Sequence, residues 1–229
     1  MKAKIGLFLL LFIFLPAQGT GLALKADSGI SPDLALKKLL DGNRSFVQNR
    51  LKIKEKSAPG LRRRLASGQH PYAVILSCSD SRVPPEIIFD KGLGELFVVR
   101  DAGNVVNPVV VGSIEYGVQH LGARLIMVLG HGQCGAVKAA LDSTGREDPN
   151  VRAIVQKIAP SVKLARRQIK GKDKSRLLDA AIDLNIKRSA QLLTKDSPLL
   201  DNLVHSGKIR IVCAKYDLKD GRVRVLSCR

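Results

Sequence analysis

Side chains of metal-binding type follow two apolar runs of the sequence. Residues 77–82 (Ser-Cys-Ser-Asp-Ser-Arg) come directly after the run 72–76, and residues 130–135 (Gly-His-Gly-Gln-Cys-Gly) directly after the run 125–129. Each run is typical of a strand buried on both faces. Because sites in open parallel sheets form beyond the carboxyl ends of the strands, we expect both segments at one edge of a sheet. That edge would gather four candidate ligands, Cys78, Asp80, His131 and Cys134.

Thiolate, imidazole and carboxylate groups are zinc ligands, and three protein ligands plus one exchangeable position are typical of a catalytic site. In the alternative reading, Cys78 and Cys134 are small buried apolar side chains and His131 is a capping residue. The metal site is favoured because His-x-x-Cys stands in a Gly-rich turn and Cys-x-Asp-x-Arg ends a second strand. The sequence lacks the Cys-x-x-Cys of a redox dithiol, and its glycine cluster lacks the Lys-Ser/Thr ending of a phosphate-binding loop.

Strand patterns alternate with helical patterns along the chain. Continuous apolar runs predict buried strands at 72–76, 96–99, 125–129 and 209–214. Helical spacing predicts helices at 109–120, 136–141 and 174–194, and two earlier ones at 32–49 and 60–66. This alternation predicts an α/β fold with a mainly parallel central sheet flanked by helices. A turn at 219–221 predicts a final antiparallel edge strand at 222–227.

The first residues have the pattern of an export signal. An apolar run at 5–15 follows Lys2 and Lys4 and ends at Pro16, too short a stretch to span a bilayer. A basic start, a short apolar stretch and then small residues indicate a secretory signal, with cleavage after Gly19 or Ala23. The alternative is an uncleaved amphipathic anchor. We therefore expect a signal peptide at 1–23 and one domain at 24–229 that is periplasmic or secreted and free of the membrane after cleavage.

The charge balance is strongly basic, with 38 Lys and Arg against 20 Asp and Glu. Nucleic acid is excluded as a partner, because aromatic residues make up only 4% of the chain and offer little surface for base stacking. A positive field that attracts a small anion or an acidic surface is the expected consequence.

The sequence resembles the β-class carbonic anhydrases in several segments. The matching segments are 78–86, 94–100, 102–104, 113–116 and 130–137. The likeness begins weakly at 39–47, and towards the end of the chain it resumes at Asn185 and ends in Tyr216-Asp217 through Gly221. Between about 143 and 175 the resemblance is thin. It implies one Zn²⁺ per chain, held by Cys78, His131 and Cys134, with water or hydroxide as the fourth ligand. Asp80 would take that fourth position in a closed state.

The same resemblance implies that Asp80 and Arg82 form a catalytic dyad. Two thiolates cancel the formal charge of Zn²⁺, so the metal should acidify its water less than a three-histidine site does. An Asp80 carboxylate can accept a hydrogen bond from the hydroxide and so aim its lone pair at the carbon of CO₂. A salt bridge from Arg82 would keep Asp80 ionised and directed.

Further residues match substrate-binding positions of the family. Gln69 would donate an amide hydrogen bond to a substrate oxygen, and the Gly135 N–H at a helix start would favour bicarbonate. Phe97 and Tyr116 would line a small apolar pocket, partly in the neighbouring subunit, and ordinary core packing is the competing interpretation. Asp101 replaces the Asn usual after Arg100, and its charge is expected to shift the interface or the anion affinity.

The implied activity is reversible hydration of CO₂ to bicarbonate and a proton by a zinc-bound hydroxide. The resemblance also implies a homodimer or higher homo-oligomer, with the 32–49 helix packing on a partner subunit. One alternative is a COS or CS₂ hydrolase on the same scaffold, and another is a catalytically silent zinc protein that binds bicarbonate. The presence of Asp80, Arg82 and Gln69 argues against the silent protein. None of His70, His120 and His205 is an obvious proton shuttle.

Two cysteines near the carboxyl terminus, Cys213 and Cys228, flank the predicted hairpin, and export makes their pairing feasible. A two-residue turn at Asp220-Gly221 would place them opposite each other. A three-residue turn with a bulge at Gly221 would place Cys213 opposite Ser227 instead.

The export signal leads to a first prediction. Protein recovered from its native host should begin just after Gly19 or Ala23 and should fractionate outside the cytoplasm, because signal peptidase removes the apolar segment. N-terminal sequencing of each cell fraction measures this. Full-length chain that starts at Met1 in the cytoplasmic fraction would refute export.

Overall fold

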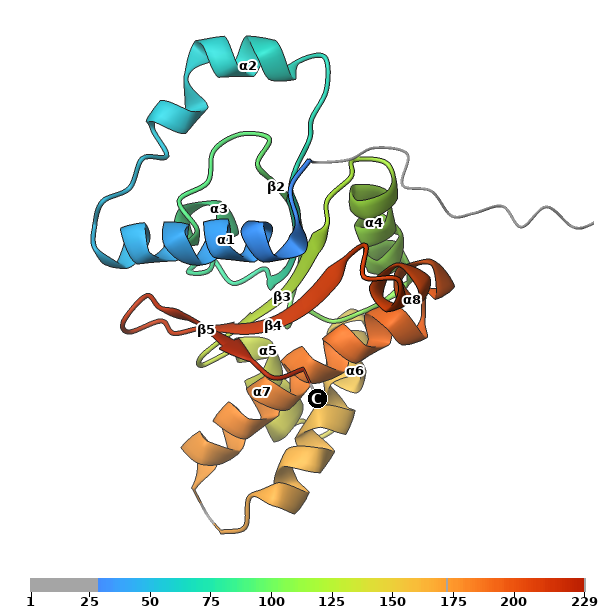
Figure 1. Cartoon of the computed structure of the whole chain (residues 1–229). Coiled ribbons are helices and arrows are strands. Elements are labelled where there is room, and N and C mark those ends of the chain that lie inside the picture. Colours follow the sequence, from blue (N-terminus) through green and yellow to red (C-terminus); the bar gives the residue numbers. More distant parts are fainter. Residues whose placement is uncertain (1–28, 172, 229) are drawn as a thin grey trace, which may run out of the picture.

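A five-stranded sheet forms the centre of the computed structural model, which describes residues 29–171 and 173–228 (Figure 1). The strands run in the order β2-β1-β3-β4-β5, and the bounds are β1 Ala73–Cys78, β2 Leu96–Asp101, β3 Leu125–His131, β4 Arg210–Tyr216 and β5 Val223–Leu226. The first four strands are parallel and β5 is antiparallel to β4. This confirms the predicted fold class. The expected signal peptide lies outside the described residues, and no helix within them is long and apolar enough to cross a membrane.

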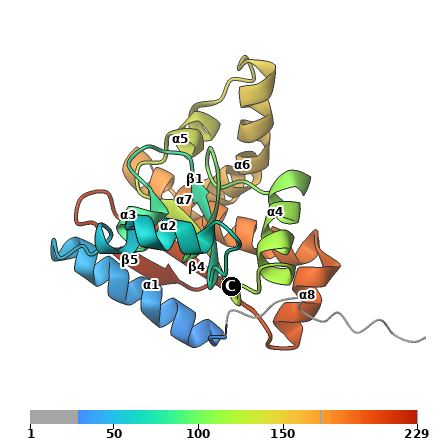
Figure 2. The same ribbon diagram turned by 90° about the horizontal axis from the view of Figure 1, so that it is seen from above.

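Helices cover both faces of the sheet (Figures 1 and 2). Their bounds are α1 Pro32–Val47, α2 Pro59–Leu65, α3 Pro85–Ile88, α4 Pro108–Gln119, α5 Gly135–Asp142, α6 Pro149–Gln168, α7 Lys174–Lys195 and α8 Pro198–His205, with a 3₁₀ turn at Glu55–Ser57. Strand side chains alternate between two apolar cores, so Ile75 packs toward α1 and α3, and Leu76 toward the α4–α8 side. Burial on both faces explains why the strands are continuous apolar runs.

The first helix packs on the sheet of its own chain, and its implied packing on a partner subunit stays a prediction. Ser31 caps it by accepting a hydrogen bond from the Leu34 N–H at 3.2 Å. Ala35 and Leu39 are fully buried in the core beneath it. Asn43 bonds to the backbone around the final hairpin, donating to the Gly221 carbonyl at 2.9 Å and accepting from the Val223 N–H at 2.9 Å. These contacts fix α1 within one protomer.

The final hairpin has a longer turn than either predicted form. The Asp217 N–H donates to the Arg222 carbonyl at 2.9 Å and the Gly221 N–H to the Asp217 carbonyl at 3.0 Å, which encloses a four-residue loop. The Asp217 carboxylate accepts from the Lys219 N–H at 2.8 Å, so an aspartate-capped turn prevails over the tighter ones. In consequence Cys213 lies opposite Leu226, and both predicted registers are wrong.

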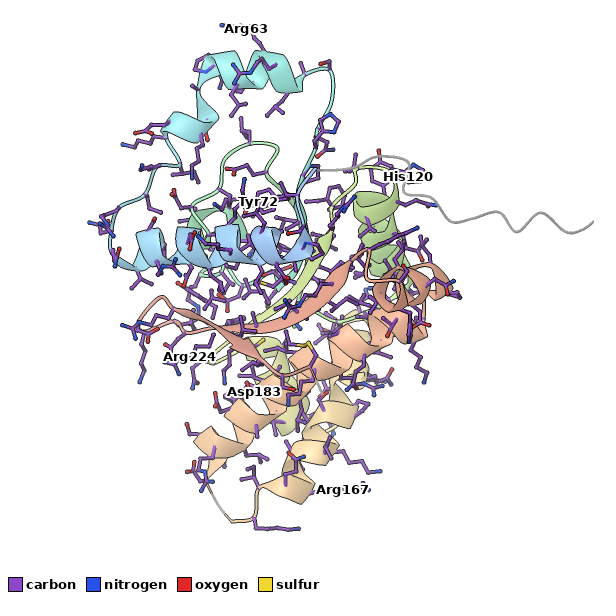
Figure 3. All side chains as sticks on the ribbon, in the orientation of Figure 1. Arg63, Tyr72, His120, Arg167, Asp183 and Arg224 are labelled. Atoms are coloured by element: carbon purple, nitrogen blue, oxygen red, sulfur yellow. A yellow bond between two sulfur atoms is a disulfide. The ribbon has the colours of Figure 1, made fainter. Side chains whose placement is uncertain are left out.

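A disulfide nevertheless joins Cys213 to Cys228 (Figure 3). Their Cα atoms are 5.4 Å apart, although Cys228 lies two residues beyond the end of β5. Cys213 is fully buried and Cys228 packs against the same core, so the cross-link ties the end of the chain to a central strand.

This cross-link generates a stability prediction. Cys228→Ser should lower the free energy of unfolding by roughly 3 kcal/mol, the chain-entropy value for a cross-link of this span, since the bonded cysteines are 15 residues apart in sequence. Val225→Ser, at an exposed position on β5, is the control. Urea unfolding without reductant measures both variants. An unchanged midpoint for Cys228→Ser, with free thiols at both positions in the wild type, would reject the cross-link.

Candidate metal centre

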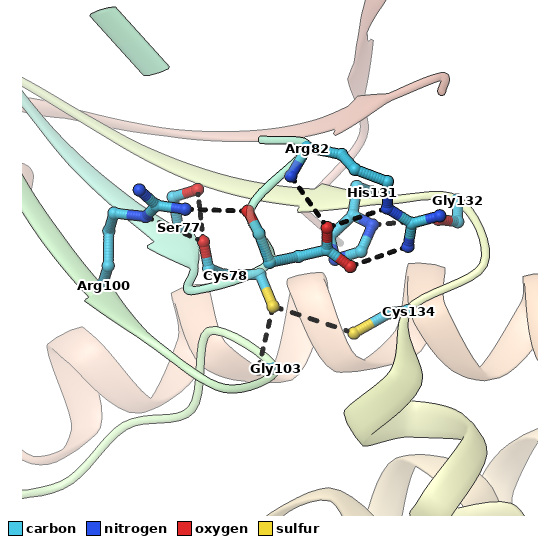
Figure 4. A network of polar contacts seen from close by, with 9 residues as sticks. Ser77, Cys78, Arg82, Arg100, Gly103, His131, Gly132 and Cys134 are labelled. Carbon is cyan, nitrogen blue, oxygen red and sulfur yellow. Dashed lines mark hydrogen bonds and ion pairs between the residues drawn. The ribbon is translucent and has the colours of Figure 1, made fainter. Parts of the chain in front are cut away.

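Three potential metal ligands meet at the carboxyl edge of the sheet. Cys78 is the last residue of β1, His131 is the last residue of the adjacent parallel strand β3, and Cys134 caps the start of α5. One ligand atom from each lies within 4.8 Å of the others, and the two Sγ atoms are 4.0 Å apart (Figure 4). All three residues are buried. The two strand ends converge as the sequence predicts.

The hydrogen bond of His131 fixes which ring nitrogen is free. Nδ1 lies 2.9 Å from the Gly132 carbonyl oxygen, which can only accept, so Nδ1 carries the proton. Nε2 therefore presents a lone pair, and it has no hydrogen-bond partner among the described residues although the side chain is fully buried. An unpaired buried nitrogen is costly, whereas a metal ligand held by a backbone carbonyl has this arrangement.

The two thiols cannot ionise independently. The pKa of Cys78 is lowered because the Cys134 thiol donates a hydrogen bond to it, and the Gly103 N–H, 3.2 Å away, also lowers it. The pKa of Cys134 is raised by the same shared bond, then by burial and by the negative charge of Cys78. The first thiolate is therefore favoured and the second opposed. A cation between the sulfur atoms would remove that opposition, so this donor set suits a thiophilic divalent metal.

A bidentate ion pair stands beside the ligands. Asp80 accepts from Arg82 Nε at 2.9 Å and from the terminal guanidinium nitrogen at 2.7 Å, and also from the Arg82 backbone N–H at 3.0 Å. These hydrogen bonds hold the pKa of Asp80 well below its usual range. One Asp80 oxygen is 3.8 Å from His131 Nε2. The carboxylate thus stays ionised at the rim of the ligand cluster, with both oxygens directed to Arg82.

Arg100 is a site residue to which the sequence reasoning gave no role. Its Nε donates to the Cys78 carbonyl at 3.0 Å and its terminal nitrogen to the Asp80 carbonyl at 2.8 Å. Arg100 therefore fixes the backbone that carries both a ligand and the acidic partner. The signal was present, since Arg100 ends one of the matching segments.

The loop after β2 is held against the ligands by hydrogen bonds from α7. Gly103 adopts φ +79°, and a Cβ there would come within 2.8 Å of Ile158 Cδ1, so its glycine is required. From α7, Asn185 donates to the Gly103 carbonyl at 2.8 Å and Ser189 to the Asn104 carbonyl at 2.9 Å. These bonds position the Gly103 N–H on the Cys78 sulfur.

Asp101 lies beneath this edge, paired in register with Cys78 on the neighbouring strand. Burial raises its pKa to about 7, against the opposing effect of a 2.7 Å hydrogen bond from the Val105 N–H. Its other oxygen has no partner among the residues that the structure describes. The position is half-buried within one protomer.

The remaining predicted substrate residues lie at opposite ends of the parallel strands, one at the carboxyl ends beside the ligands and the others near the amino ends. Gly135 begins α5 next to Cys134. Gln69 is exposed and precedes the start of β1, at the edge opposite Cys78. Phe97 pairs with Val74 near that far edge, and its ring centroid is 6.1 Å from that of Tyr116 on α4. One chain therefore gathers Gln69, Phe97 and Tyr116 away from its own ligand cluster.

Comparison with known proteins gives a consistent result. A profile of the carbonic anhydrase family matches residues 73–223. The chain is 42% identical over 195 residues to carbonic anhydrase 2 of Mycobacterium tuberculosis, covering 84% of this chain and 91% of that protein. It superposes on the β-carbonic anhydrase CafA of Aspergillus fumigatus with a TM-score of 0.68 and 26% identity, over 86% of this chain and 91% of that one.

A second solved structure, from a study of two tetrameric β-carbonic anhydrases of Sordaria macrospora, gives a TM-score of 0.68 at 25% identity, over 85% of this chain and 98% of that one. Fold, relatives and the Cys-His-Cys cluster agree. The chain belongs to the β-class carbonic anhydrases, and it is a lyase of that family.

Proposed function

We propose that the protein interconverts CO₂ and bicarbonate with one zinc ion held by Cys78, His131 and Cys134. The observation that carries this proposal is the cluster itself, three ligand atoms within 4.8 Å of one another with an ionised carboxylate at its rim. Two sulfur ligands and one imidazole nitrogen form a set that zinc prefers. A zinc ion held there would supply a Lewis acid that makes hydroxide available from water near neutral pH.

Asp80 orients the attacking hydroxide in this proposal. Its carboxylate is ionised, so it can only accept hydrogen bonds, and a hydroxide that donates to it turns its lone pair elsewhere. Arg82 engages both carboxylate oxygens, which fixes their direction and keeps them from the ligand position. This pairing supports the open arrangement over one in which Asp80 itself is a ligand. Arg100 fixes the same segment through the Asp80 carbonyl.

The start of α5 supplies the complement to a product anion. Gly135 is the first residue of this eight-residue helix, directly after Cys134. The first N–H groups of a helix have no partner within it and favour negative charge. Bicarbonate formed beside Cys134 would therefore meet backbone donors, and no separate basic side chain is needed for that contact.

We also propose a homodimer in which each chain lends residues to the partner's site. The strand β2 lies at the end of the sheet, with a neighbour on one side only among the described residues. Val109 is 79% exposed and Tyr116 is 49% exposed on the adjoining helix α4. An unpaired edge beside exposed apolar side chains is typical of an interface. In such a dimer, three residues that are remote from the ligand cluster of their own chain would lie near the cluster of the partner chain: Gln69, Phe97 and Tyr116.

The dimer predicts a defined hydrodynamic result. The wild-type chain should sediment at twice its monomer mass or more, and Val109→Asp should shift it toward monomer and reduce activity. Val151→Asp, at an exposed position on α6, should change neither. A monomeric wild type with full activity would contradict the shared site.

Export is supported by the cross-link between Cys213 and Cys228, because disulfides persist in oxidising compartments such as the periplasm. We propose a periplasmic or secreted location on that basis together with the amino-terminal pattern. The activity would then act on CO₂ and bicarbonate outside the cytoplasm.

Stopped-flow CO₂ hydration with metal analysis tests the proposed chemistry. Wild type should bind one zinc per chain and hydrate CO₂, and Cys134→Ser should lose most of its zinc. Asp80→Asn should keep the zinc but lose activity by about 100-fold or more, the usual worth of a positioned proton acceptor. Asp142→Asn, an exposed carboxylate on α5, is the matched control and should behave as wild type.

Each arm has a contrary outcome. Near-stoichiometric zinc in Cys134→Ser would remove that ligand from the assignment. CO₂ hydration at the wild-type rate in Asp80→Asn would show that Asp80 does not orient the hydroxide. COS offered in parallel separates the alternative activity, since a zinc-loaded protein that hydrolyses COS without hydrating CO₂ would displace the proposal.

A further inference from the structure

A second cavity lies between the helices α6 and α7, outside the metal centre. Its volume is about 320 Å³, and its walls come from the middle and end of α6 and from the second half of α7. None of its lining residues belongs to the ligand cluster or to the Asp80–Arg82 pair. A volume of this size suits a small organic ligand.

The polar lining of this cavity consists of hydrogen-bond donors and carries no carboxylate. Lys187 and Arg188 supply two positive charges from α7, and Ser161, Gln168 and Gln191 supply a hydroxyl and two amides. Among the described residues the Arg188 Nε atom has no hydrogen-bond partner, and no carboxylate of the lining faces its guanidinium group. A concave surface of one charge sign attracts the opposite ion.

Two buried atoms of the lining lack partners in the described chain. The Oγ atom of Ser161, a residue only 2% exposed, has no hydrogen bond, and neither has the buried Nε of Arg188. Buried donors without acceptors each cost on the order of 1–3 kcal/mol, and native proteins rarely leave them so. Ser161 lies on α6 and Arg188 on α7, and both residues line the cavity.

The other walls are apolar. Leu164 and Leu184 face the cavity from opposite helices, and Pro160 adds a ring from within α6. The C-terminal segment supports one side, because Gln191 donates to the Cys228 carbonyl at 3.3 Å and Cys228 is tied to β4. A ligand here must combine an acceptor-rich head with a short hydrocarbon part.

We propose that this cavity is a binding site for a small organic anion with a carboxylate or phosphate head. The planar guanidinium of Arg188 matches either head with two parallel hydrogen bonds. Ser161 and the two glutamine amides add donors, while the leucines and Pro160 hold the hydrocarbon part. The site is separate from CO₂ hydration and does not depend on the metal.

Calorimetric titration of the intact zinc protein with butyrate, monobutyl phosphate and inorganic phosphate tests the proposal. Butyrate or monobutyl phosphate should bind saturably and more tightly than inorganic phosphate, which lacks the apolar part. Arg188→Met should weaken binding by at least about tenfold, since charge-assisted hydrogen bonds contribute that much or more. Arg176→Met, an exposed arginine earlier on α7 and outside the cavity, should leave the affinity within about twofold.

A second variant tests the cavity without changing Arg188. Leu164 is 41% exposed, so the Leu164→Glu protein should still fold, and the new carboxylate should repel anions at the cavity wall. Val151→Glu, on the same helix but outside the cavity, should fold as well and leave anion binding unchanged. Amide NMR shifts on adding butyrate should centre on 157–168 and 184–191. Three results would each overturn the proposal in favour of a water-filled cavity. The first is unaltered affinity in both Arg188→Met and Leu164→Glu, and the second is a set of shifts confined to the neighbourhood of Cys78. The third is a titration that does not saturate by about 50 mM, a concentration outside the range of specific sites.

Discussion

Two buried sulfur atoms 4.0 Å apart set the constraint on which the rest of this structure depends. One can ionise with help from its neighbours, and the second is opposed by the first and by burial. A cation resolves the conflict, and His131 presents an unpaired nitrogen toward the same point. A metal ion held there would relieve the repulsion between the two sulfur atoms and supply a partner for the His131 nitrogen.

Only a few elements of the fold bring the two sulfur atoms and His131 together. Parallel pairing of β1 with β3 brings Cys78 and His131 to one edge. Gln133 adopts φ +54°, an uncommon conformation for a residue other than glycine, in the turn that leads to Cys134. Below, α7 holds the Gly103 loop through Asn185 and Ser189, so the helix that shapes the second cavity also supports the metal centre.

The sequence predicted this centre well because its signals are local. Apolar runs marked β1 and β3, and ligand types followed each run, so convergence needed only the rule for parallel sheets. The hairpin was harder, because the Asp217 side chain selects a longer turn than Asp220-Gly221 suggests. The helix α6 was not delimited by pattern, since Pro160 stands inside it and its exposed face is basic. The role of Gln69 was assigned by family likeness alone. Gln69 precedes β1 and Cys78 ends it, so the six residues of this strand separate Gln69 from the ligand cluster of its own chain.

The central claim is that Cys78, His131 and Cys134 together hold zinc, and X-ray absorption at the zinc edge tests it most directly. The account predicts two sulfur neighbours at about 2.3 Å, one imidazole nitrogen at about 2.0–2.1 Å and one further light atom. The signal of one sulfur should disappear in Cys134→Ser protein reconstituted with excess zinc. A zinc shell made only of oxygen and nitrogen, or one unchanged by that substitution, would contradict the account.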